Sequence, residues 1–413
     1  MKYRELFFNP RIMAIGIMGF ASGLPLSLSD STLQAWLTVE NMSIASIGMF
    51  SLVGFPYLFK FAWAPLLDWL NLGFLGRRKD WIFVFQLCVA ASLLCMGQMD
   101  FAENQLYIVG AIAFSIALFS ASQDIVVDAY RADVSRANER AFAAAISVTG
   151  YRIAMIVSGA GALIAAQTFG FSVVYSVLGC LMVFCALLNF VFPKVQSNDP
   201  SGGYGLKSLA APFYDLIFRK EFLLIIFLVL SYKLGDAFAG RLTTTFLLRH
   251  LEFSLVDVGS INKALGLAAS IIGAIYGGVI VYRFGLYRSL LYFGVLQALT
   301  NLGFFVLSLF EKNYFGLVAV IGLENLAGGM GTAAFIAFLM NICNKSYTAT
   351  QFAILTAVAS LGRVFSGPPS GFLVEAYGWS WFFIFSFLVA LPSIVVLRIY
   401  RVRLDGYFSK ELK

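Results

Sequence analysis

Charged side chains inside long apolar runs are the residues of this sequence that could do chemistry. A charge at the centre of a bilayer costs about 2.5–3.5 kcal/mol on insertion scales, so such a side chain normally faces a bundle interior or an aqueous path. The chemistry on offer is proton uptake, ion pairing and the binding of an anionic ligand. The acids are Asp30, Asp124, Asp128, Asp236 and Glu324, and the bases are Lys60, Arg152, Lys233, Arg241, Lys263 and Arg363.

Arg152 and Arg363 are the strongest candidates for binding an anionic substrate. They are related by a shift of 211 residues. A guanidinium stays charged in any protein environment and can bind a carboxylate through two parallel hydrogen bonds. The alternative is that each arginine only pairs with a nearby carboxylate. Further side chains expected to contact a substrate are Lys60, Lys263, Lys233, Gln123 and Asn325.

Four of the intramembrane carboxylates are candidates for taking up a proton. Asp124 ranks first and Glu324 second, because they lie in equivalent runs of the repeat described below and an arginine lies in the run that follows each. The alternative is a static ion pair with that arginine. Asp236 has Lys233 one turn away, which would keep it ionised or form a bridge that only makes insertion tolerable. Asp30 lies toward the end of its run.

The composition excludes several classes of protein. Of the 413 residues, 60% are hydrophobic and 12% are charged, whereas a soluble domain is about half apolar and about one quarter charged. An ordinary soluble enzyme, a disordered protein and a nucleic-acid binder are therefore excluded. The five cysteines form no CxxC pair and there is a single histidine, so we expect no metal site, no cofactor and no enzymatic activity.

The elements that must position the charged side chains are membrane-spanning helices of about 20 residues each. Lysines and arginines fall almost entirely in loops that share one side of the membrane when the N-terminus is cytoplasmic, so both termini are predicted to be cytoplasmic. The predicted fold is all-α and polytopic, with twelve spans at residues 12–38, 44–68, 81–99, 105–130, 141–166, 171–192, 222–248, 255–282, 289–310, 314–343, 350–376 and 380–399.

A repeat divides the twelve spans into two halves. The 211-residue shift carries Thr32 to Thr243 and Gly48 to Gly259 as well as relating the two arginines. In each group of three spans the first carries acids, the second carries bases and the third has no charge in its interior, so the third is expected to face lipid. Parallel halves of this kind are the layout of major facilitator superfamily transporters. The predicted domains are a six-helix bundle at 1–192, a cytoplasmic linker at 193–220, a second bundle at 221–400 and a tail at 401–413.

The segment after the second span resembles the loop signature of that superfamily, at a stretched spacing. Asp68 precedes two glycines and the basic run Arg77-Arg78-Lys79, and Asp128 ends the fourth span on the same side. An acid and a basic run in this place are suited to holding the cytoplasmic ends of helices together. We therefore predict a gating role for Asp68, Arg77, Arg78 and Asp128.

Six segments resemble the AmpG muropeptide permease family of Gram-negative bacteria, and the similarity covers residues 10–400. The resemblance implies proton-driven import of N-acetylglucosaminyl-1,6-anhydro-N-acetylmuramyl peptides across the inner membrane for peptidoglycan recycling. In hosts with an inducible β-lactamase it also implies a part in induction of that enzyme, and so in antibiotic resistance. The segments are FASGLPLSLSDSTLQAWLTVEN, SASQDIVVDAYRADV, AAAISVTGYR, YKLGDAFAGRLTTTFLLR, INKALGL and ENLAGGMGTAAFIAFLMNICNKSYTATQFA.

The partners expected from this resemblance are the muropeptide, protons and the lipid bilayer, with no nucleic acid, and the chain is expected to be a monomer. Familiar members of the family carry two further C-terminal spans, where this sequence ends at Lys413. Two other functions stay open on the residues alone. One is transport of another sugar, peptide or drug by a major facilitator. The other is a membrane sensor that does not transport, which the cost of inserting so many charges disfavours.

Overall fold

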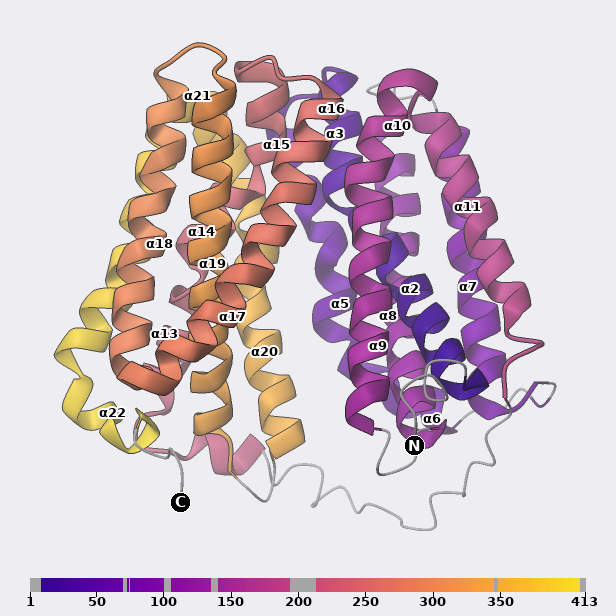
Figure 1. Ribbon diagram of the computed structural model, residues 1–413, viewed down its shortest axis with the longest axis horizontal. Helices are drawn as coiled ribbons and strands as arrows, with labels where there is room; N and C mark the ends of the chain where they lie inside the picture. The colour runs from indigo at the N-terminus through magenta and orange to yellow at the C-terminus, as the bar shows by residue number, and fades with distance from the viewer. Residues whose placement is uncertain are drawn as a thin grey trace. The chain divides into compact units, whose positions relative to one another are not determined.

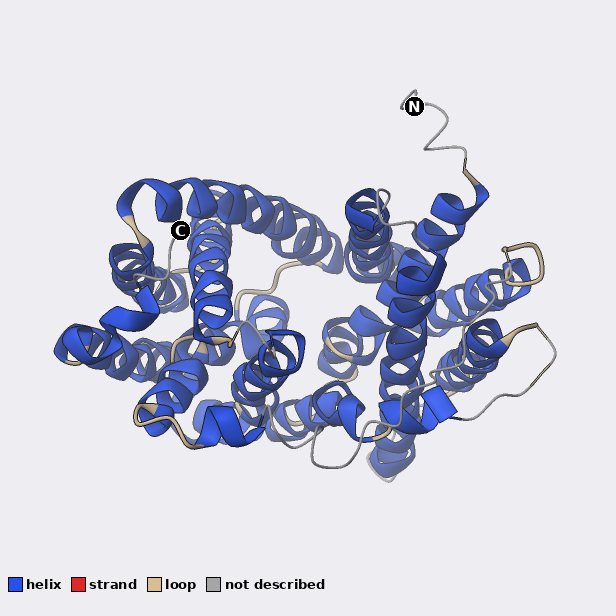
Figure 2. Ribbon diagram, turned by 90° about the horizontal axis from the view of Figure 1, so that it is seen from below, coloured by secondary structure: helices blue, strands red, loops and turns tan. Residues whose placement is uncertain are grey.

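The computed structural model describes residues 9–69, 73, 75–99, 105–134, 140–193, 213–344 and 348–408, and every regular element within them is a helix (Figures 1 and 2). Some of the helix starts are capped by side chains. The side chain of Asn9 accepts a hydrogen bond from the backbone N–H of Arg11 at 3.0 Å, with Pro10 in the first turn. Ser254 and Asp257 form a capping box at the start of the eighth span. The predicted all-α class is confirmed.

Several spans consist of more than one helical segment. In the first half these are α2 (Pro10–Ser29), α3 (Ser31–Val39), α4 (Ile44–Met49), η1 (Phe50–Gly54), α5 (Phe55–Phe59), η2 (Lys60–Ala62), α6 (Ala64–Trp69), α7 (Arg77–Gly97), α8 (Leu106–Val134), α9 (Arg140–Met155), η4 (Ile156–Gly161), α10 (Ala162–Phe169) and α11 (Phe171–Leu188). In the second half they are α13 (Phe222–Ser231), α14 (Leu234–Arg241), α15 (Thr243–Thr245), η5 (Phe246–His250), α16 (Leu255–Asp257), η6 (Val258–Leu265), α17 (Gly266–Phe284), α18 (Leu286–Ser308), α19 (Tyr314–Ile342), α20 (Thr348–Phe365), α21 (Gly367–Ile399) and α22 (Arg401–Phe408).

Eleven helical segments among the described residues are long and apolar enough to cross a membrane. The last of them, Gln351–Ile399, contains 49 residues, about twice what one crossing needs. Its backbone turns at Gly378, whose φ of 79° lies in the left-handed region that glycine tolerates. Because this segment contains the last two predicted spans, the structure accounts for all twelve.

Breaks inside the spans coincide with polar residues. Asp30 separates α2 from α3, and Lys233 separates α13 from α14. Ser366 separates α20 from α21, and Pro368 follows in the first turn of α21, where proline is tolerated. Such breaks free backbone groups, and inside a membrane protein these are tolerated where protein or water can satisfy them.

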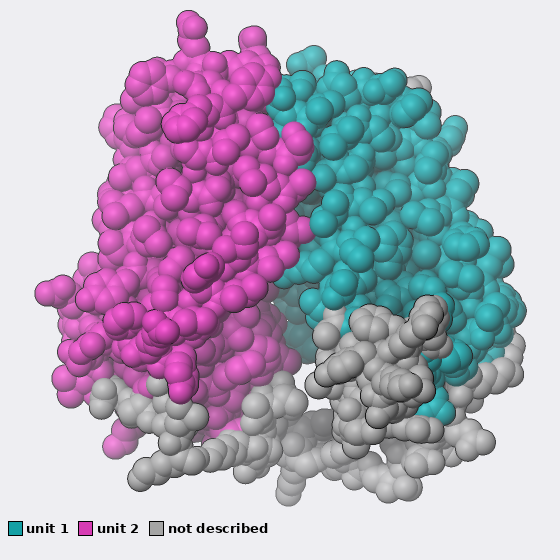
Figure 3. Space-filling model, in the orientation of Figure 1, with its two compact units in different colours: residues 1–42, 53–201, 254–259 teal, residues 43–52, 202–253, 260–413 magenta. Residues whose placement is uncertain are grey.

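By their contacts the residues form two compact units (Figure 3). Unit 1 comprises Met1–Met42, Val53–Ser201 and Ser254–Gly259. Unit 2 comprises Ser43–Leu52, Gly202–Phe253 and Ser260–Lys413. Residues 194–212, most of the predicted linker, lie outside the described residues, so the domain boundaries drawn from the sequence stay a prediction.

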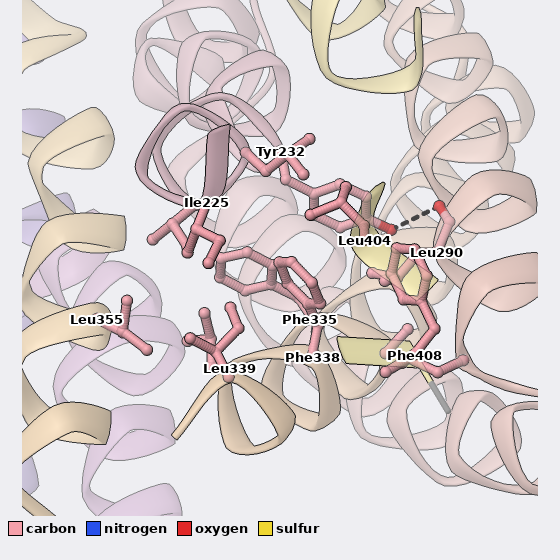
Figure 4. Close-up of a cluster of buried hydrophobic side chains, with 14 of the residues drawn as sticks. Ile225, Tyr232, Leu290, Phe335, Phe338, Leu339, Leu355, Leu404 and Phe408 are labelled. Atoms are coloured by element: carbon pink, nitrogen blue, oxygen red, sulfur yellow. Dashed lines mark hydrogen bonds between the residues drawn. The ribbon is translucent and has the colours of Figure 1, made fainter. Parts of the chain in front are cut away.

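Unit 2 contains a cluster of buried apolar side chains from α13, α18, α19 and α22 (Figure 4). Tyr232 stacks on Phe335 with a centroid distance of 5.4 Å, and its hydroxyl donates a hydrogen bond to the carbonyl oxygen of Leu290 at 3.0 Å. Leu404 and Phe408 bring α22 into the same cluster. The short helix after the last span is therefore packed against the unit rather than detached from it.

Two adjacent glycines on α17 differ sharply in the space around them. A Cβ atom on Gly277 would lie 2.7 Å from the Cα of Met330 on α19, whereas a Cβ atom on Gly278 would meet nothing within 4 Å. We expect Gly277→Ala to lower the free energy of unfolding by about 1–3 kcal/mol, because it overpacks a close helix contact. The matched variant Gly278→Ala should be neutral or stabilising, since alanine favours a helix. Thermal unfolding midpoints of the two purified variants check this, and equal midpoints would contradict it.

A polar network ties the start of unit 2's first span to the turn between α19 and α20. The carboxylate of Asp215 accepts hydrogen bonds from Arg219 at 2.5 Å, from Gln351 at 2.7 Å and from Asn344 at 3.1 Å. Arg219 also donates to Gln351 at 3.1 Å and to the carbonyl oxygen of Ile342. These bonds, led by the one from Arg219, lower the pKa of Asp215 from 3.8 to about 2.

This network predicts a pH-dependent contribution to stability. Because the pKa of Asp215 is lower in the folded chain, its contribution is full above about pH 4 and is lost as the pH falls toward about 2. Asp215→Asn should therefore lower the unfolding midpoint at pH 7, and the difference from wild type should shrink between pH 4 and 2. Thermal scans across this range measure it, with Glu311→Gln, a change at an exposed loop carboxylate, as the control. A difference that does not change with pH would refute the assignment.

Candidate functional site

In unit 1, five polar side chains on three neighbouring helices each have at least one buried atom without a hydrogen-bond partner among the described residues. These atoms are the hydroxyl oxygens of Ser22, Tyr57 and Ser120, both amide atoms of Gln123, and Oδ1 of Asp124. The described part of unit 1 has one further such atom, Oδ1 of Asn189, which is not included below. The five side chains come from α2, α5 and α8. We call these five residues the unit 1 polar cluster.

The unit 1 polar cluster is unusual for a protein interior. Buried polar groups are normally hydrogen-bonded, and an unsatisfied one costs about 1–3 kcal/mol. Within a membrane a polar group depends even more on hydrogen-bond partners from the protein, because lipid chains offer none. Gln123 is fully buried, so bulk solvent does not reach its amide. Such a group of donors and acceptors is suited to binding a polar ligand, or a proton on Asp124.

The charge that acts most strongly on Asp124 comes from Lys60, at the start of η2 in the second span. The Asp128 carboxylate acts on it in the opposite sense, and the Ser22 hydroxyl lies beside it. Arg152, which the sequence offered as a partner for Asp124, is exposed on α9 and forms no ion pair with any acid in the described part of the chain. Arg152 is therefore available to bind another anion. Lys60 supplies the positive charge near Asp124 that the sequence analysis offered to Arg152.

In unit 2, Lys233 lies at the break between α13 and α14 and is fully coordinated. Its ammonium group donates to Asp236 Oδ2 at 2.8 Å, to Gln297 Oε1 at 2.6 Å and to the carbonyl oxygen of Gly328 at 3.2 Å. An ammonium group has three N–H donors, so these acceptors satisfy it completely. The internal salt bridge suggested by the spacing of Lys233 and Asp236 is present.

Glu324 on α19 belongs to the same group of charges. One of its carboxylate oxygens accepts a hydrogen bond from Asn325 at 2.8 Å, and both Asp236 and Lys233 act on it electrostatically. Two carboxylates thus lie near one ammonium group. With both ionised the group carries one excess negative charge, which a single proton neutralises. We call Lys233, Asp236, Gln297, Glu324 and Asn325 the unit 2 charged cluster.

The remaining predicted site residues take separate places in the structure. Arg363 is exposed on α20 and, like Arg152, pairs with no acid among the described residues. Lys263 lies in the π-helical segment η6, and Asp30 is exposed at the break between α2 and α3. π-Helical segments often occur at functional sites, so this position is consistent with Lys263 as a candidate site residue.

Of the predicted gating residues, two can be described in full. Arg78 pairs with Asp133 at 3.2 Å, and Asp128 pairs with Arg131 at 2.9 Å on its own helix. Asp68 lies in α6 and Arg77 begins α7, but the side chains of both lie outside what the structure describes.

Two buried polar residues were not identified as candidates from the sequence. Asp80 in the first turn of α7 is fully buried and accepts hydrogen bonds from the backbone N–H groups of Gly73, at 2.8 Å, and Leu75. Its position beside the basic run was the available signal. Gln297 lies on α18, a span without charges that was expected to face lipid, yet it is 3% exposed and holds Lys233. The expectation considered charges alone and so did not include this amide on the packed face of α18.

Comparison with known proteins places the chain in a family. The family model described as the Major Facilitator Superfamily matches residues 12–365 and 269–410. The anhydromuropeptide permease of Escherichia coli (strain K12) is 45% identical over 405 residues, covering 98% of this chain and 82% of that protein. A protein named putative transporter AmpG 4 from Rickettsia conorii is 33% identical, covering 96% of this chain and 98% of that protein.

Solved structures share the fold. A bacterial homologue of the human lysosomal transporter Spinster, in an inward-facing and unoccupied conformation, superposes with a TM-score of 0.72 at 14% identity, covering 99% of this chain and all of that one. At this identity the similarity concerns the fold alone. The family match and the relative at 45% identity over nearly the whole chain go further. This chain is a multi-pass membrane transporter of the major facilitator superfamily and belongs to the family of the anhydromuropeptide permeases.

Proposed function

We propose that the chain imports anhydro-muropeptides, that is, N-acetylglucosaminyl-1,6-anhydro-N-acetylmuramic acid and its peptides, across the bacterial inner membrane together with protons. The observation that carries the proposal is the unit 1 polar cluster, with its unpartnered hydroxyl, amide and carboxylate atoms. The similarity to a protein named anhydromuropeptide permease supports the substrate class. The imported sugars and peptides would serve peptidoglycan recycling and, in hosts with an inducible β-lactamase, its induction.

The unit 1 polar cluster suits the sugar part of such a substrate. The amide of Gln123 both donates and accepts, as do the hydroxyl groups of Tyr57, Ser120 and Ser22. Sugar hydroxyl and acetamido groups offer matching donors and acceptors. A site built from buried polar groups discriminates strongly against a ligand that leaves them unpaired. This property favours a polyhydroxylated ligand over an apolar drug.

Arg152 and Arg363 suit the anionic part of the substrate. Both are exposed and, within the described residues, unpaired, so binding a carboxylate would break no existing ion pair. Lys60 and Lys263 are proposed to contribute positive charge, and Asn325 a further amide. Lys233 is proposed to contact the substrate only after it releases one of its three acceptors.

Proton coupling is proposed to use Asp124 first and Glu324 second. Asp124 has one buried oxygen without a partner, and a proton on that carboxyl group removes a charge that the surrounding helices satisfy poorly. Glu324 is acted on electrostatically by both Asp236 and Lys233, so a proton there removes the excess negative charge of the unit 2 charged cluster. Asp236 and Asp30 are the remaining candidates.

The gating residues proposed are Asp68, Arg77, Arg78 and Asp128, at the end of the molecule that the distribution of lysines and arginines assigns to the cytoplasm. On this orientation both termini are cytoplasmic. The chain is proposed to act as a monomer without a cofactor.

The experiment that tests the proposed function is uptake of labelled anhydro-muropeptide into proteoliposomes containing the purified chain. We expect accumulation above the external concentration when the outside is acidic, and equilibration only when a protonophore removes the gradient. Empty liposomes give the background. Absence of uptake, with robust uptake of another sugar or peptide, would reject the substrate class. Accumulation that is indifferent to the gradient would reject proton coupling.

A further inference from the structure

Five arginines gather around the end of unit 2's last span and the turn between α17 and α18. Arg398, Arg401 and Arg403 belong to the end of α21 and to α22, and Arg283 and Arg288 flank the turn at Gly285. Arg401 links the two groups, because its guanidinium lies 4.8 Å from the ring centroid of Tyr287 on α18. We call Arg283, Arg288, Arg398, Arg401 and Arg403 the basic patch.

These arginines differ from three other arginines near the ends of the spans. Arg78, Arg131 and Arg219 each pair with an aspartate. In the described part of the chain no acid forms an ion pair with an arginine of the basic patch. Arg283, Arg288, Arg401 and Arg403 are exposed. Among the side chains that the structure describes, which do not include that of Asp405, the basic patch therefore presents positive charge that no acid pairs with.

The surroundings of the basic patch are those of a membrane surface. α22 turns Leu404 and Phe408 into the apolar cluster of unit 2, as Figure 4 shows, while Val402 between the two arginines is 88% exposed. Exposed Tyr282 and Tyr292 lie on α17 and α18, and tyrosines with one apolar and one polar side are typical of the headgroup level. The apolar run of α21 ends at Ile399, directly before the first arginine of α22.

We propose that the basic patch binds the phosphodiester headgroups of anionic phospholipids and that α22 lies in the headgroup layer. A guanidinium is suited to this task, since it binds phosphate oxygens through paired hydrogen bonds and is weakly hydrated. Juxtamembrane arginines gain affinity from the negative surface of such a leaflet. The proposal concerns the lipid around the transporter and does not depend on which substrate it carries.

The test measures lipid binding rather than transport. The purified full-length chain in neutral detergent is titrated with phosphatidylglycerol or phosphatidylcholine, and retained lipid is counted by native mass spectrometry. We expect the wild type to prefer phosphatidylglycerol. Arg401→Gln with Arg403→Gln should weaken that binding roughly 25-fold, at about fivefold for each arginine. Arg283→Gln with Arg288→Gln should do the same, and this pair avoids the ring contacts of α22 should the first pair fail to fold.

The matched control is Lys312→Gln. Lys312 lies in the loop between α18 and α19, and its ammonium group lies over the rings of Phe253 and Tyr314. This substitution should leave the preference for phosphatidylglycerol unchanged. Equal binding of the two lipids, or arginine variants that bind as the wild type does, would overturn the proposal. So would displacement of the lipid by equimolar inorganic phosphate, since the patch would then be a site for free anions.

Discussion

Asp124→Asn is expected to abolish gradient-driven accumulation of substrate while leaving exchange of substrate across the membrane intact. Asparagine keeps the shape of a protonated carboxyl group but can neither release nor take up a proton. The binding contacts of the unit 1 polar cluster therefore persist while the link to the proton gradient is lost. In proteoliposomes, accumulation should fall to simple equilibration, and exchange between labelled internal and unlabelled external substrate should continue.

The comparison variants for this prediction are Glu324→Gln and Glu311→Gln. Glu311 is exposed in the loop before α19, so its neutralisation should leave both accumulation and exchange unchanged. Glu324→Gln tests the second candidate, because it removes the carboxylate on which Lys233 and Asp236 act electrostatically. If accumulation survives in both Asp124→Asn and Glu324→Gln, neither carboxylate couples transport, and Asp236 and Asp30 become the candidates. If Asp124→Asn also stops exchange, its role lies in binding or folding.

The spans could be predicted from the sequence because the bilayer sets their length. A run such as 289–310 must be apolar over about 20 residues, and the structure places α18 at Leu286–Ser308. The triplet pattern of charges predicts that Asp124, Lys60, Lys233 and Glu324 lie in the membrane interior, and each of them falls within a helical segment long and apolar enough to cross a membrane. Both signals depend on the cost of removing charge from water, which acts on each span separately.

The partners of these charges could not be predicted in the same way. Whether Asp124 meets Lys60 or Arg152 depends on how each helix is rotated about its axis and where it breaks, and the breaks at η2 and at Lys233 are not marked by proline or glycine at the charge itself. The amide of Gln297 was overlooked because candidate residues were selected by charge, and an amide carries none. In unit 2 the contacts of that one amide decide how Lys233 is held.

Arg152 and Arg363 give the second large expected effect. If each binds a substrate carboxylate, replacing it by glutamine removes a charge-assisted contact worth about 1.5–3 kcal/mol, or roughly 10- to 150-fold in affinity. Replacement by lysine should rescue little of the loss, because a point charge cannot reproduce the paired geometry of a guanidinium. Binding of labelled anhydro-muropeptide to the purified variants measures the effect, with Lys312→Gln as a control that should bind as the wild type does.

Comparing two ligands, one with and one without free carboxyl groups, tests whether these arginines bind carboxylates. An anhydro-disaccharide without peptide, whose one carboxyl group is blocked as an amide, keeps the sugar groups proposed to meet Gln123 and Tyr57 but offers the arginines no anion. If the arginines bind carboxylates, Arg152→Gln and Arg363→Gln should scarcely change its affinity. A loss as large as that seen for the full muropeptide would show instead that the two arginines hold the helices in place. Because both side chains are exposed and pair with no acid among the described residues, we expect the difference between the two ligands to be clear.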